Sequence, residues 1–292
     1  MGINHVFSFV TSHPLNKGAK ISALGRLVRW QIGSRLLNQP VVMPFVEGTS
    51  LLMETGMTGA TGNWYCGLHE LDEMGFVLHA LRPADVFADI GANVGSYSVL
   101  AGGVAGAKVV AVEPLPATFA KLQRNIAFNN MTDRISAHCL GISSEVGTLK
   151  FVSSLDTMNR VALHDEDVPT VEVAVTTLDL LFADTKPTFI KIDVEGHEKW
   201  VIEGGASIFS SAELKAIIIE TNESGAKFGV TDAELMAKIK SYGFTPHGYD
   251  ALSRTILPLP AGAKNTIFVR NPVEMQALCR AAPRYHLING SI

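Results

Sequence analysis

The sequence predicts an α/β fold with a mostly parallel sheet of seven strands that has an antiparallel end. From Asp85 onward, short apolar segments of strand length alternate with segments of helical periodicity, which is the pattern of βαβ units. A glycine-rich turn, residues 89–95, lies between the first strand and the first helix of this series. The last two strand-like segments follow a helix stop at Tyr242-Gly243-Phe244, and we expect them to form the antiparallel end.

Each element of the series is expected from its own pattern. Apolar runs predict strands over Val86–Ile90, Val109–Val112, Ile135–Ile142, Phe189–Val194, Ala216–Glu220, Phe244–Tyr249 and Thr266–Arg270. Helical spacing predicts helices over Ser96–Val104, Ala117–Asn129, Glu198–Phe209 and Asp232–Tyr242. Thr231 is the expected N-cap of the last helix. Two segments, Thr148–Val152 and Val171–Thr176, are expected to form an inserted or edge β pair.

The residues before Pro83 predict an extension, residues 1–82, that precedes a domain of residues 83–292. Its expected elements are a short helical lead within residues 1–40, a β-hairpin of Val41–Val46 and Ser50–Glu54, a glycine-rich loop over Thr55–Gly67 and a helix over Gly67–Arg82. Pro83 stops that helix, so the domain boundary is expected there.

Composition excludes several classes of protein. The chain has 292 residues, of which 47% are hydrophobic and 18% charged, and a formal net charge of −4. This balance supports a folded core and gives no sign of a nucleic-acid binder. The three cysteines are scattered, without a CxxC motif, so neither a disulfide framework nor a zinc site is expected. We expect a cytoplasmic protein without a signal peptide or a membrane span.

The strongest motif is the segment Asp89-Ile90-Gly91-Ala92-Asn93-Val94-Gly95. A cofactor that lies across the carboxyl end of a strand needs close approach to the backbone, which glycine permits. Glu113 follows at the end of the next strand, where an acidic side chain can accept both hydroxyls of a ribose. The expected cofactor-binding residues are therefore Asp89, Gly91, Asn93, Gly95 and Glu113, with structural glycines in a plain turn as the alternative.

The spacing of the glycines favours S-adenosyl-L-methionine over NAD. A dinucleotide loop places glycines at its first, third and sixth positions, but here those positions hold Gly91, Asn93 and Ser96. Asp89 would repel a pyrophosphate and attract a sulfonium or an amino group. An NAD-dependent oxidoreductase remains the disfavoured alternative.

A second acidic cluster follows the strand predicted over Phe189–Val194. Asp193 and Glu195 lie at its end, two residues apart, and would point alike if the strand continued. Together with Glu220 at the end of the next strand, they are the expected catalytic residues, and Asp193 is also expected at the cofactor. The alternative is that Glu195 and His197 cap the following helix.

Other polar residues carry weaker expectations. His69 and Glu70 either cap the helix that follows them or fold over the cofactor, and the cap is slightly favoured. Asp193, Glu195 and Glu220 could together hold Mg²⁺, but the nine histidines show no HxH or HxxxH spacing, so no metal site is expected.

The sequence resembles the FkbM family of methyltransferases. The resemblance rests on the segments DVFADIGANVGSYSVLAG (Asp85–Gly102), VEPLPATFAKLQRNIAFN (Val112–Asn129), TLDLLF (Thr177–Phe182) and FIKIDVEGHEKWVIEG (Phe189–Gly204), and it extends from about Tyr65 to Glu220. It implies a Rossmann-like class I methyltransferase fold and methyl transfer to oxygen, commonly to a hydroxyl of a sugar or a natural product. By the family pattern, Asp89, Gly91 and Asn93 form the cofactor loop, Glu113 binds the ribose and Asp193 lies beside the methyl donor.

The implied partner is a small-molecule or glycan hydroxyl acceptor, whose identity the family pattern does not give. Transfer would be an in-line displacement at the methyl group, and the chain would align the acceptor and provide a carboxylate for its proton. Substrate choice is expected in the Ser153–Pro169 insertion and near the two ends of the sequence. A non-catalytic module that keeps the cofactor fold, such as an assembly partner, remains an alternative.

Overall fold

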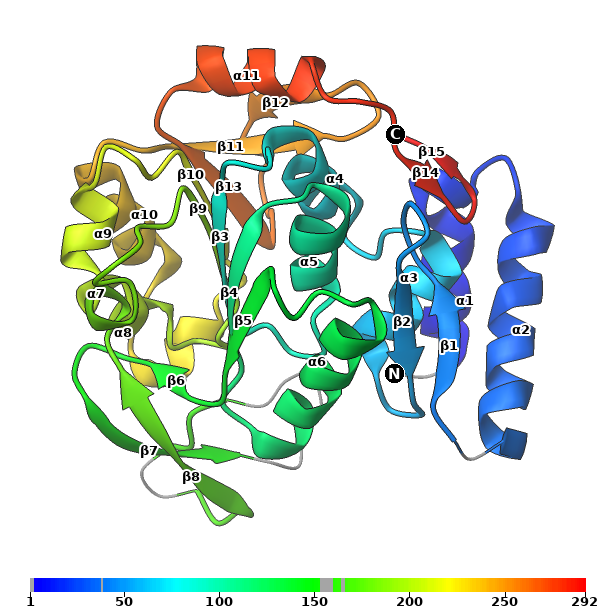
Figure 1. The fold of residues 1–292 in the computed structure, drawn as a ribbon, viewed down its shortest axis with the longest axis horizontal. Helices are drawn as coiled ribbons and strands as arrows, with labels where there is room; N and C mark the ends of the chain where they lie inside the picture. Colours follow the sequence, from blue (N-terminus) through cyan, green and yellow to red (C-terminus); the bar gives the residue numbers. More distant parts are fainter. Residues whose placement is uncertain (1–2, 38, 153–159, 164–165) are drawn as a thin grey trace.

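The computed structural model describes residues 3–37, 39–152, 160–163 and 166–292. Residues 153–159 and 164–165 of the Ser153–Pro169 insertion, where substrate choice is expected, therefore lie outside the described residues. An α/β domain with a central sheet fills one side of the molecule, and the first 66 residues form two helices, a hairpin and a third helix beside it (Figure 1).

The central sheet has eight strands in the order β12-β11-β13-β10-β9-β3-β4-β5. Their bounds are β3 Val86–Ile90, β4 Lys108–Val112, β5 Ile135–His138, β9 Phe189–Ile192, β10 Ala216–Glu220, β11 Thr245–Asp250, β12 Thr255–Pro258 and β13 Asn265–Val269. The pairs among β5, β4, β3, β9 and β10 are parallel, and those of β13 with β10 and β11 are antiparallel. This confirms the Rossmann-like arrangement with an antiparallel end.

The expected number of seven strands was wrong by one. The additional strand, β12, pairs antiparallel with β11 after a turn in which the Asp250 carboxylate accepts the backbone N–H groups of Leu252 and Ser253. Pro258 made this short segment look unlike a strand, but proline is tolerated at the edge of a sheet, where β12 lies.

The helices cover the sheet and form the side extension. Their bounds are α1 Ile3–Ser12, α2 Lys20–Leu37, α3 Thr58–Cys66, α4 Leu71–Ala80, α5 Ser96–Val99, α6 Pro116–Phe128, α7 Leu178–Leu181, α8 Glu198–Glu203, α9 Ala206–Ser210, α10 Asp232–Ser241 and α11 Pro272–Arg280. The prediction of Thr231 as the N-cap of α10 is confirmed, because its side chain accepts the N–H of Glu234 in a capping box. No helix of the described chain is both long and apolar enough to cross a bilayer.

The expected loop over Thr55–Gly67 was wrong, since most of it is helix α3. Its glycines lowered the helix propensity of the segment, but every residue from Ala60 to Cys66 is buried. Tertiary packing therefore outweighs local propensity here. The hairpin prediction is confirmed by β1 Val41–Pro44 and β2 Ser50–Met53, which pair antiparallel.

The third predicted strand, Ile135–Ile142, divides into two. Its first part is β5 of the central sheet, and Gly141–Ile142 forms β6, which pairs with β8 Thr170–Thr176. The strand β7 Gly147–Val152 pairs antiparallel with β8, which confirms the predicted β pair.

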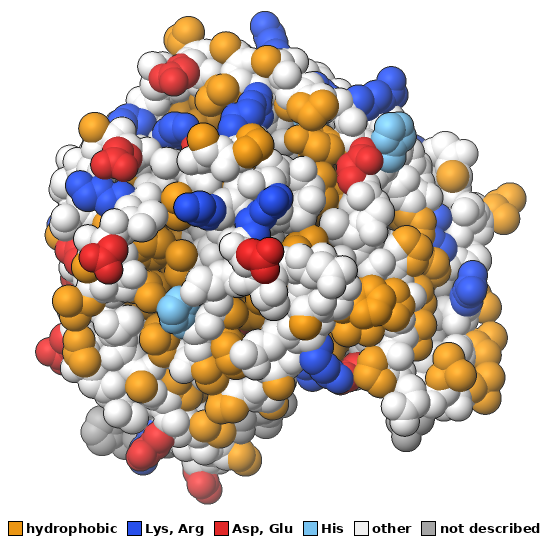
Figure 2. All heavy atoms as spheres, viewed as in Figure 1, with side chains coloured by type: hydrophobic (Ala, Val, Ile, Leu, Met, Phe, Trp, Pro, Cys, Tyr) orange, Lys and Arg blue, Asp and Glu red, His pale blue; other side chains and the backbone are white. Residues whose placement is uncertain are grey.

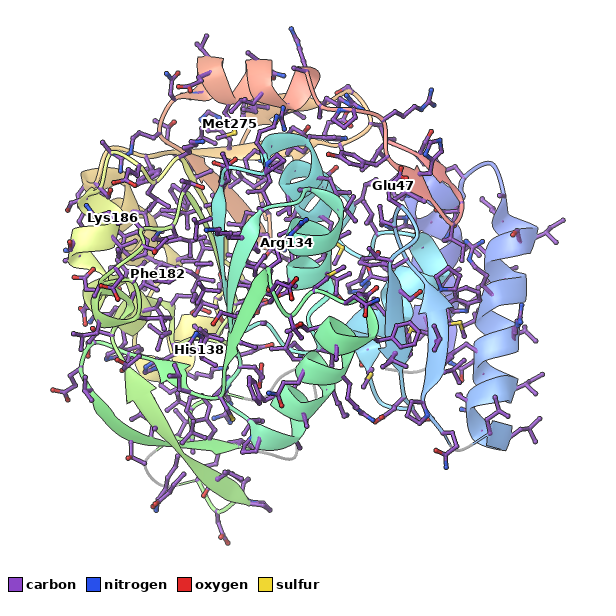
Figure 3. All side chains as sticks on the ribbon, viewed as in Figure 1. Glu47, Arg134, His138, Phe182, Lys186 and Met275 are labelled. Atoms are coloured by element: carbon purple, nitrogen blue, oxygen red, sulfur yellow. The ribbon has the colours of Figure 1, made fainter. Side chains whose placement is uncertain are left out.

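Apolar side chains fill both sides of the central sheet (Figure 3). Phe182, at the end of α7, belongs to one buried cluster, and Met275, on α11, belongs to the other. The cluster that contains Met275 also includes Leu27 and Trp64, so the packing is continuous from the first helices into the residues after Pro83.

Candidate active site

A cleft lies at the carboxyl ends of β3, β4, β9 and β10. It consists of two adjoining pockets, with cavity volumes of 60 and 240 Å³, that share the lining residues Gly91, Asn93, Asp193 and Glu195. Ligands of open α/β sheets bind at this edge. Most of the residues predicted from the glycine motif and all three of the second acidic cluster line this cleft, but Gly95 lines neither pocket.

The glycine turn has little free space around it, because other segments of the same chain pack against it. Gly91 has φ +82°, and an added Cβ would lie 1.9 Å from the carbonyl oxygen of Asp193. Gly95 has φ +91°, and its added Cβ would lie 2.6 Å from the side chain of Leu122 on α6. Both positions therefore require glycine for the fold itself. The sequence analysis had ascribed this need for glycine to the close approach of a cofactor, with a structural role as the alternative.

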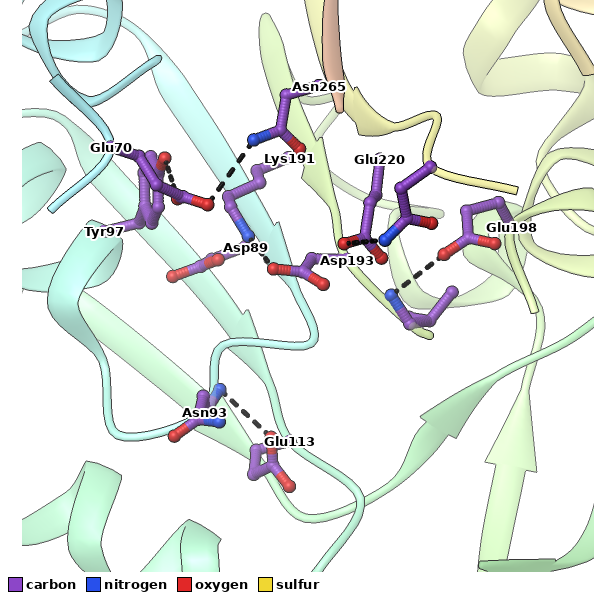
Figure 4. A network of polar contacts seen from close by, with 12 residues as sticks. Glu70, Asp89, Asn93, Tyr97, Glu113, Lys191, Asp193, Glu198, Glu220 and Asn265 are labelled. Carbon is purple, nitrogen blue, oxygen red and sulfur yellow. Dashed lines mark hydrogen bonds and ion pairs between the residues drawn. The ribbon is translucent and has the colours of Figure 1, made fainter. Parts of the chain in front are cut away.

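Glu113 is held in the smaller pocket by backbone amides. Its Oε2 accepts the N–H of Asn93 at 3.0 Å, and its Oε1 accepts the N–H of Leu115 at 3.1 Å (Figure 4 shows the bond to Asn93). Burial raises the pKa of Glu113 to about 7, although the two amides oppose this shift. Each carboxylate oxygen keeps a second acceptor position for a ligand.

A buried lysine organises the larger pocket. Lys191 on β9 is 6% exposed, and its ammonium lies 2.7 Å from the Asp193 carboxylate and 4.6 Å from the ring centroid of Tyr97. Burial alone would lower the pKa of Lys191, but the carboxylates of Asp193, Glu70 and Asp89 raise it overall. Lys191 therefore stays charged between these acids (Figure 4).

Asp89 lies one strand away, in register with Lys191. It is 1% exposed, and its Oδ2 accepts the hydroxyl of Ser98 at 2.6 Å. Its Oδ1 is buried and has no hydrogen-bond partner among the described residues. Burial raises the pKa of Asp89, which Lys191 partly offsets. An orphaned carboxylate oxygen at the wall of a pocket is a candidate contact for a ligand that donates a proton or carries positive charge.

Asp193, Glu195 and Glu220 converge at the other side of this pocket. One carboxylate oxygen of each lies within 4.8 Å of those of the other two. Burial, and then the charge of Asp193, raise the pKa of Glu195 to about 7. Burial, followed by Asp193 and Glu195, raises the pKa of Glu220 to about 8. The carboxyl groups of Glu195 and Glu220 therefore change protonation state near neutral pH.

The reason given for the pairing of Asp193 with Glu195 was wrong, although the pairing itself is observed. Strand β9 ends at Ile192, and Glu195 has φ +54°, so the chain turns rather than continuing as a strand. Gly196 follows with φ +104°, and this turn directs the chain into α8.

The helix cap proposed for Glu195 and His197 was wrong, because α8 has no side-chain cap bond, and Glu198 instead fixes the turn that precedes the helix. Glu198 accepts the N–H groups of Val194 and Gly196, each at 3.2 Å. His197 has no side-chain cap bond; its ring stacks on Trp200 with centroids 4.6 Å apart, and its Nε2 lies 3.1 Å from the Ser143 hydroxyl. Glu195 is thereby left available to the cleft.

The cap slightly favoured for His69 and Glu70 was also wrong. Helix α4 has no side-chain cap bond; instead Glu70 accepts the hydroxyl of Tyr97 at 2.6 Å, and Asn265 at 3.4 Å (Figure 4). His69 lines the same pocket, and its ring occupies the space where a side chain on Gly62 would be.

The sequence argument missed Lys191, Tyr97 and Asn63 as residues of the cleft. Asn63 lines the larger pocket, where its side chain donates to the Ser96 hydroxyl and accepts the N–H of His69. Lys191 carried a signal that could have been used, because a lysine in the middle of an apolar strand is rarely buried without a partner. Tyr97 and Asn63 depend on contacts between distant segments and had no such signal.

Comparisons with known proteins agree with this geometry. The family described as "Methyltransferase FkbM domain" matches residues 89–246, which is more than half of the chain. The hexuronic acid methyltransferase AglP of Haloferax volcanii is 26% identical over 178 residues, covering 59% of this chain and 70% of AglP. The 31-O-demethyl-FK506 methyltransferase FkbM of Streptomyces tacrolimicus is 24% identical over 200 residues, covering 56% and 74% of the two chains.

A solved structure, the methyltransferase FkbM from Methylobacillus flagellatus, is similar with a TM-score of 0.47 at 16% identity. The match covers 84% of this chain and 60% of that chain. The family match spans the glycine turn, Glu113 and the acidic cluster. The chain belongs to the FkbM family of methyltransferases.

Proposed function

We propose that this chain is an S-adenosylmethionine-dependent O-methyltransferase that acts on an uncharged hydroxyl of a sugar or natural product. The observation that carries the proposal is the convergence of Asp193, Glu195 and Glu220 in the same pocket as the Gly91 turn. A hydroxyl acceptor needs a group to take its proton, and this cluster offers carboxylates beside the expected cofactor loop.

The residues of the cleft fit S-adenosylmethionine. The smaller pocket combines the Glu113 carboxylate with the apolar side chains of Ile142 and Phe151, as a nucleoside requires. The larger pocket presents the orphaned Oδ1 of Asp89 and an excess of carboxylates, which suits an ammonium and a sulfonium and opposes a diphosphate. When bound, this cofactor supplies a methyl group that is attached to a positively charged sulfur, and the sulfur becomes a neutral thioether after transfer.

The carboxylates are assigned different tasks. Lys191 engages Asp193 at 2.7 Å, so Asp193 is assigned to positioning and to cofactor contact. Glu195 has a pKa of about 7 and is assigned as the general base. The acceptor oxygen would form the new C–O bond as the bond between the methyl carbon and sulfur breaks, and the proton of the acceptor would go to Glu195. Glu220 is the neighbouring carboxyl that receives or shares this proton.

The charge of the pocket bears on the acceptor. Hexuronic acid is the acceptor in the name of one relative and a demethylated FK506 in that of another. Three carboxylates within 4.8 Å of one another would repel an acceptor with its own carboxylate near the reacting hydroxyl. We therefore favour a neutral sugar or polyketide hydroxyl over a hexuronic acid.

Calorimetry followed by an acceptor panel tests the proposal. S-adenosylhomocysteine should bind to one saturable site, and NAD should not bind. Transfer of a labelled methyl group should then occur to neutral glycosides or polyketides more readily than to uronic acids. Saturable NAD binding without binding of S-adenosylhomocysteine would overturn the cofactor assignment, and methylation of nitrogen or carbon alone would overturn the acceptor class.

A further inference from the structure

The positive charge of the first helices differs from that of the rest of the chain. Residues 1–46 contain five of the 24 Lys and Arg residues and none of the 28 Asp and Glu residues. Their formal charge is +5, whereas the remaining residues carry −9. A basic segment on an otherwise acidic protein indicates a partner of negative charge.

Helix α2 also exposes an apolar stripe. Its side chains Ile21, Val28, Ile32 and Leu36 are 89%, 54%, 56% and 78% exposed. At 3.6 residues per turn they lie within an arc of about 80°. The opposite face of the helix is buried through Ala23, Leu27, Trp30 and Ser34. Helix α2 is therefore anchored to the protein along one face and apolar along the other.

Basic side chains flank this stripe. Arg29 and Arg35 are exposed, and helical spacing places them on opposite sides of the apolar residues. Lys20 is exposed at the start of the helix. Within the described part of the chain, none of these three side chains forms a salt bridge. In Figure 2, hydrophobic side chains lie along the margin where α2 lies, with basic side chains among them.

We propose that the outer face of α2 binds the surface of an anionic lipid bilayer. An apolar stripe between basic side chains is the arrangement of helices that lie in the plane of a membrane interface. The stripe would insert between headgroups, while Lys20, Arg29 and Arg35 contact lipid phosphates. The helix would lie on the bilayer without crossing it.

Other occupants fit this face less well. A symmetric contact with a second copy would place the same basic patch against itself, so the two faces would repel each other. A nucleic acid would use the basic side chains but leave the apolar stripe in water. Light scattering tests for the second copy.

Vesicle co-sedimentation of the full chain tests the proposal. Wild-type protein should sediment with vesicles of equimolar phosphatidylcholine and phosphatidylglycerol, but not with phosphatidylcholine alone. The double substitution Arg29→Gln/Arg35→Gln should weaken this binding about 25-fold, at about fivefold for each basic residue. The double substitution Ile21→Gln/Ile32→Gln should weaken it by at least about tenfold, because less apolar area is buried.

Val273→Gln is the matched control, since Val273 is an exposed aliphatic residue, 82% exposed, at the start of another helix, α11. This variant should bind vesicles as the wild type does. All substituted side chains are exposed, so melting temperatures should be unchanged, and circular dichroism checks this. The proposal is overturned if the wild type ignores anionic vesicles, or if the α2 variants bind them normally. Light scattering that shows a dimer lost in the Ile21→Gln/Ile32→Gln variant would overturn it in favour of a second copy.

Discussion

Glu113 and Glu195 line the same cleft, and burial is the main cause that raises the pKa of each to about 7, but the groups around the two carboxyls differ. Two backbone amides fix Glu113 in its pocket, and burial is the main cause of its raised pKa. Glu195 lies in a strained turn among other carboxylates, and the structure records no amide donor to its side chain within the described residues. We infer from this difference that equal proton affinity accompanies different tasks: the immobilised carboxylate is suited to binding, and the carboxylate beside other acids is suited to proton transfer.

The largest effect is expected when the charge of Glu195 is removed. Glu195→Gln keeps size and hydrogen bonding but loses basicity, so turnover should fall by about 10²-fold or more, with cofactor affinity nearly unchanged. Wild-type turnover should rise with pH through about 7, as Glu195 loses its proton, and this rise should disappear in the variant. Glu223→Gln is the matched control, because Glu223 also has a positive φ but is exposed outside both pockets. If the Glu195→Gln variant turns over at the wild-type rate, Glu195 is not the base, and Glu220 or solvent takes the proton of the acceptor.

The next effect concerns binding at Glu113. Two charge-assisted hydrogen bonds to ribose hydroxyls contribute about 2–3 kcal/mol, so Glu113→Ala should weaken binding of S-adenosylhomocysteine about 30- to 150-fold. Calorimetry measures this, with the exposed Glu145→Ala as a control. An unchanged Kd for Glu113→Ala would show that the nucleoside binds elsewhere.

A smaller effect is expected on stability at Glu220. Its pKa is raised to about 8 in the folded protein, so the folded state binds this proton more tightly than the unfolded chain does. Stability is therefore lost as pH rises from about 4.5 through 8. Glu220→Gln removes this loss. Relative to the wild type, the variant should therefore gain about 1 kcal/mol of stability, or about 2–4 °C in Tm, when the pH is raised from about 5 to about 8.5. Melting curves at both pH values check this, and the same shift in Glu213→Gln, an exposed glutamate, would contradict the assignment.

The pH dependence of wild-type stability combines two opposing sets of groups. Burial lowers the pKa of His79 and His197 to about 4, so stability is lost as pH falls from about 6.5 through 4. The raised carboxyls Glu113, Glu195 and Glu220 cause loss on the alkaline side. Tm should therefore be highest between pH about 5 and 6.5, and a Tm that rises steadily from pH 5 to 8.5 would contradict the raised carboxyl pKa values.

The smallest effect is expected on removal of metal ions. Lys191 already provides a positive charge 2.7 Å from Asp193, so the acidic cluster has a resident counter-charge. A chelator such as EDTA should leave turnover unchanged. A chelator-sensitive rate, restored by Mg²⁺, would show instead that Asp193, Glu195 and Glu220 hold a cation.

Much of the fold could be predicted because its signals are local. Apolar runs located the parallel strands, helical spacing located the helices, and Thr231 marked the start of α10. Helix α3 and strand β12 were missed, since burial outweighs the low helix propensity of the first, and the second is a short edge strand that ends in a proline. The cleft could be predicted from the strand ends. The φ of Glu195 and the bonds of Glu198 to the N–H groups of Val194 and Gly196 depend on a turn that the strand pattern did not indicate.

A crystal structure of the protein with S-adenosylhomocysteine tests the central claim most directly. We expect the ribose hydroxyls on Glu113, the amino group near the unpaired Oδ1 of Asp89, and the sulfur directed toward the pocket formed by Asp193, Glu195 and Glu220. A ligand bound with its ribose away from Glu113, or with its sulfur turned away from these carboxylates, would contradict the division between binding and proton transfer.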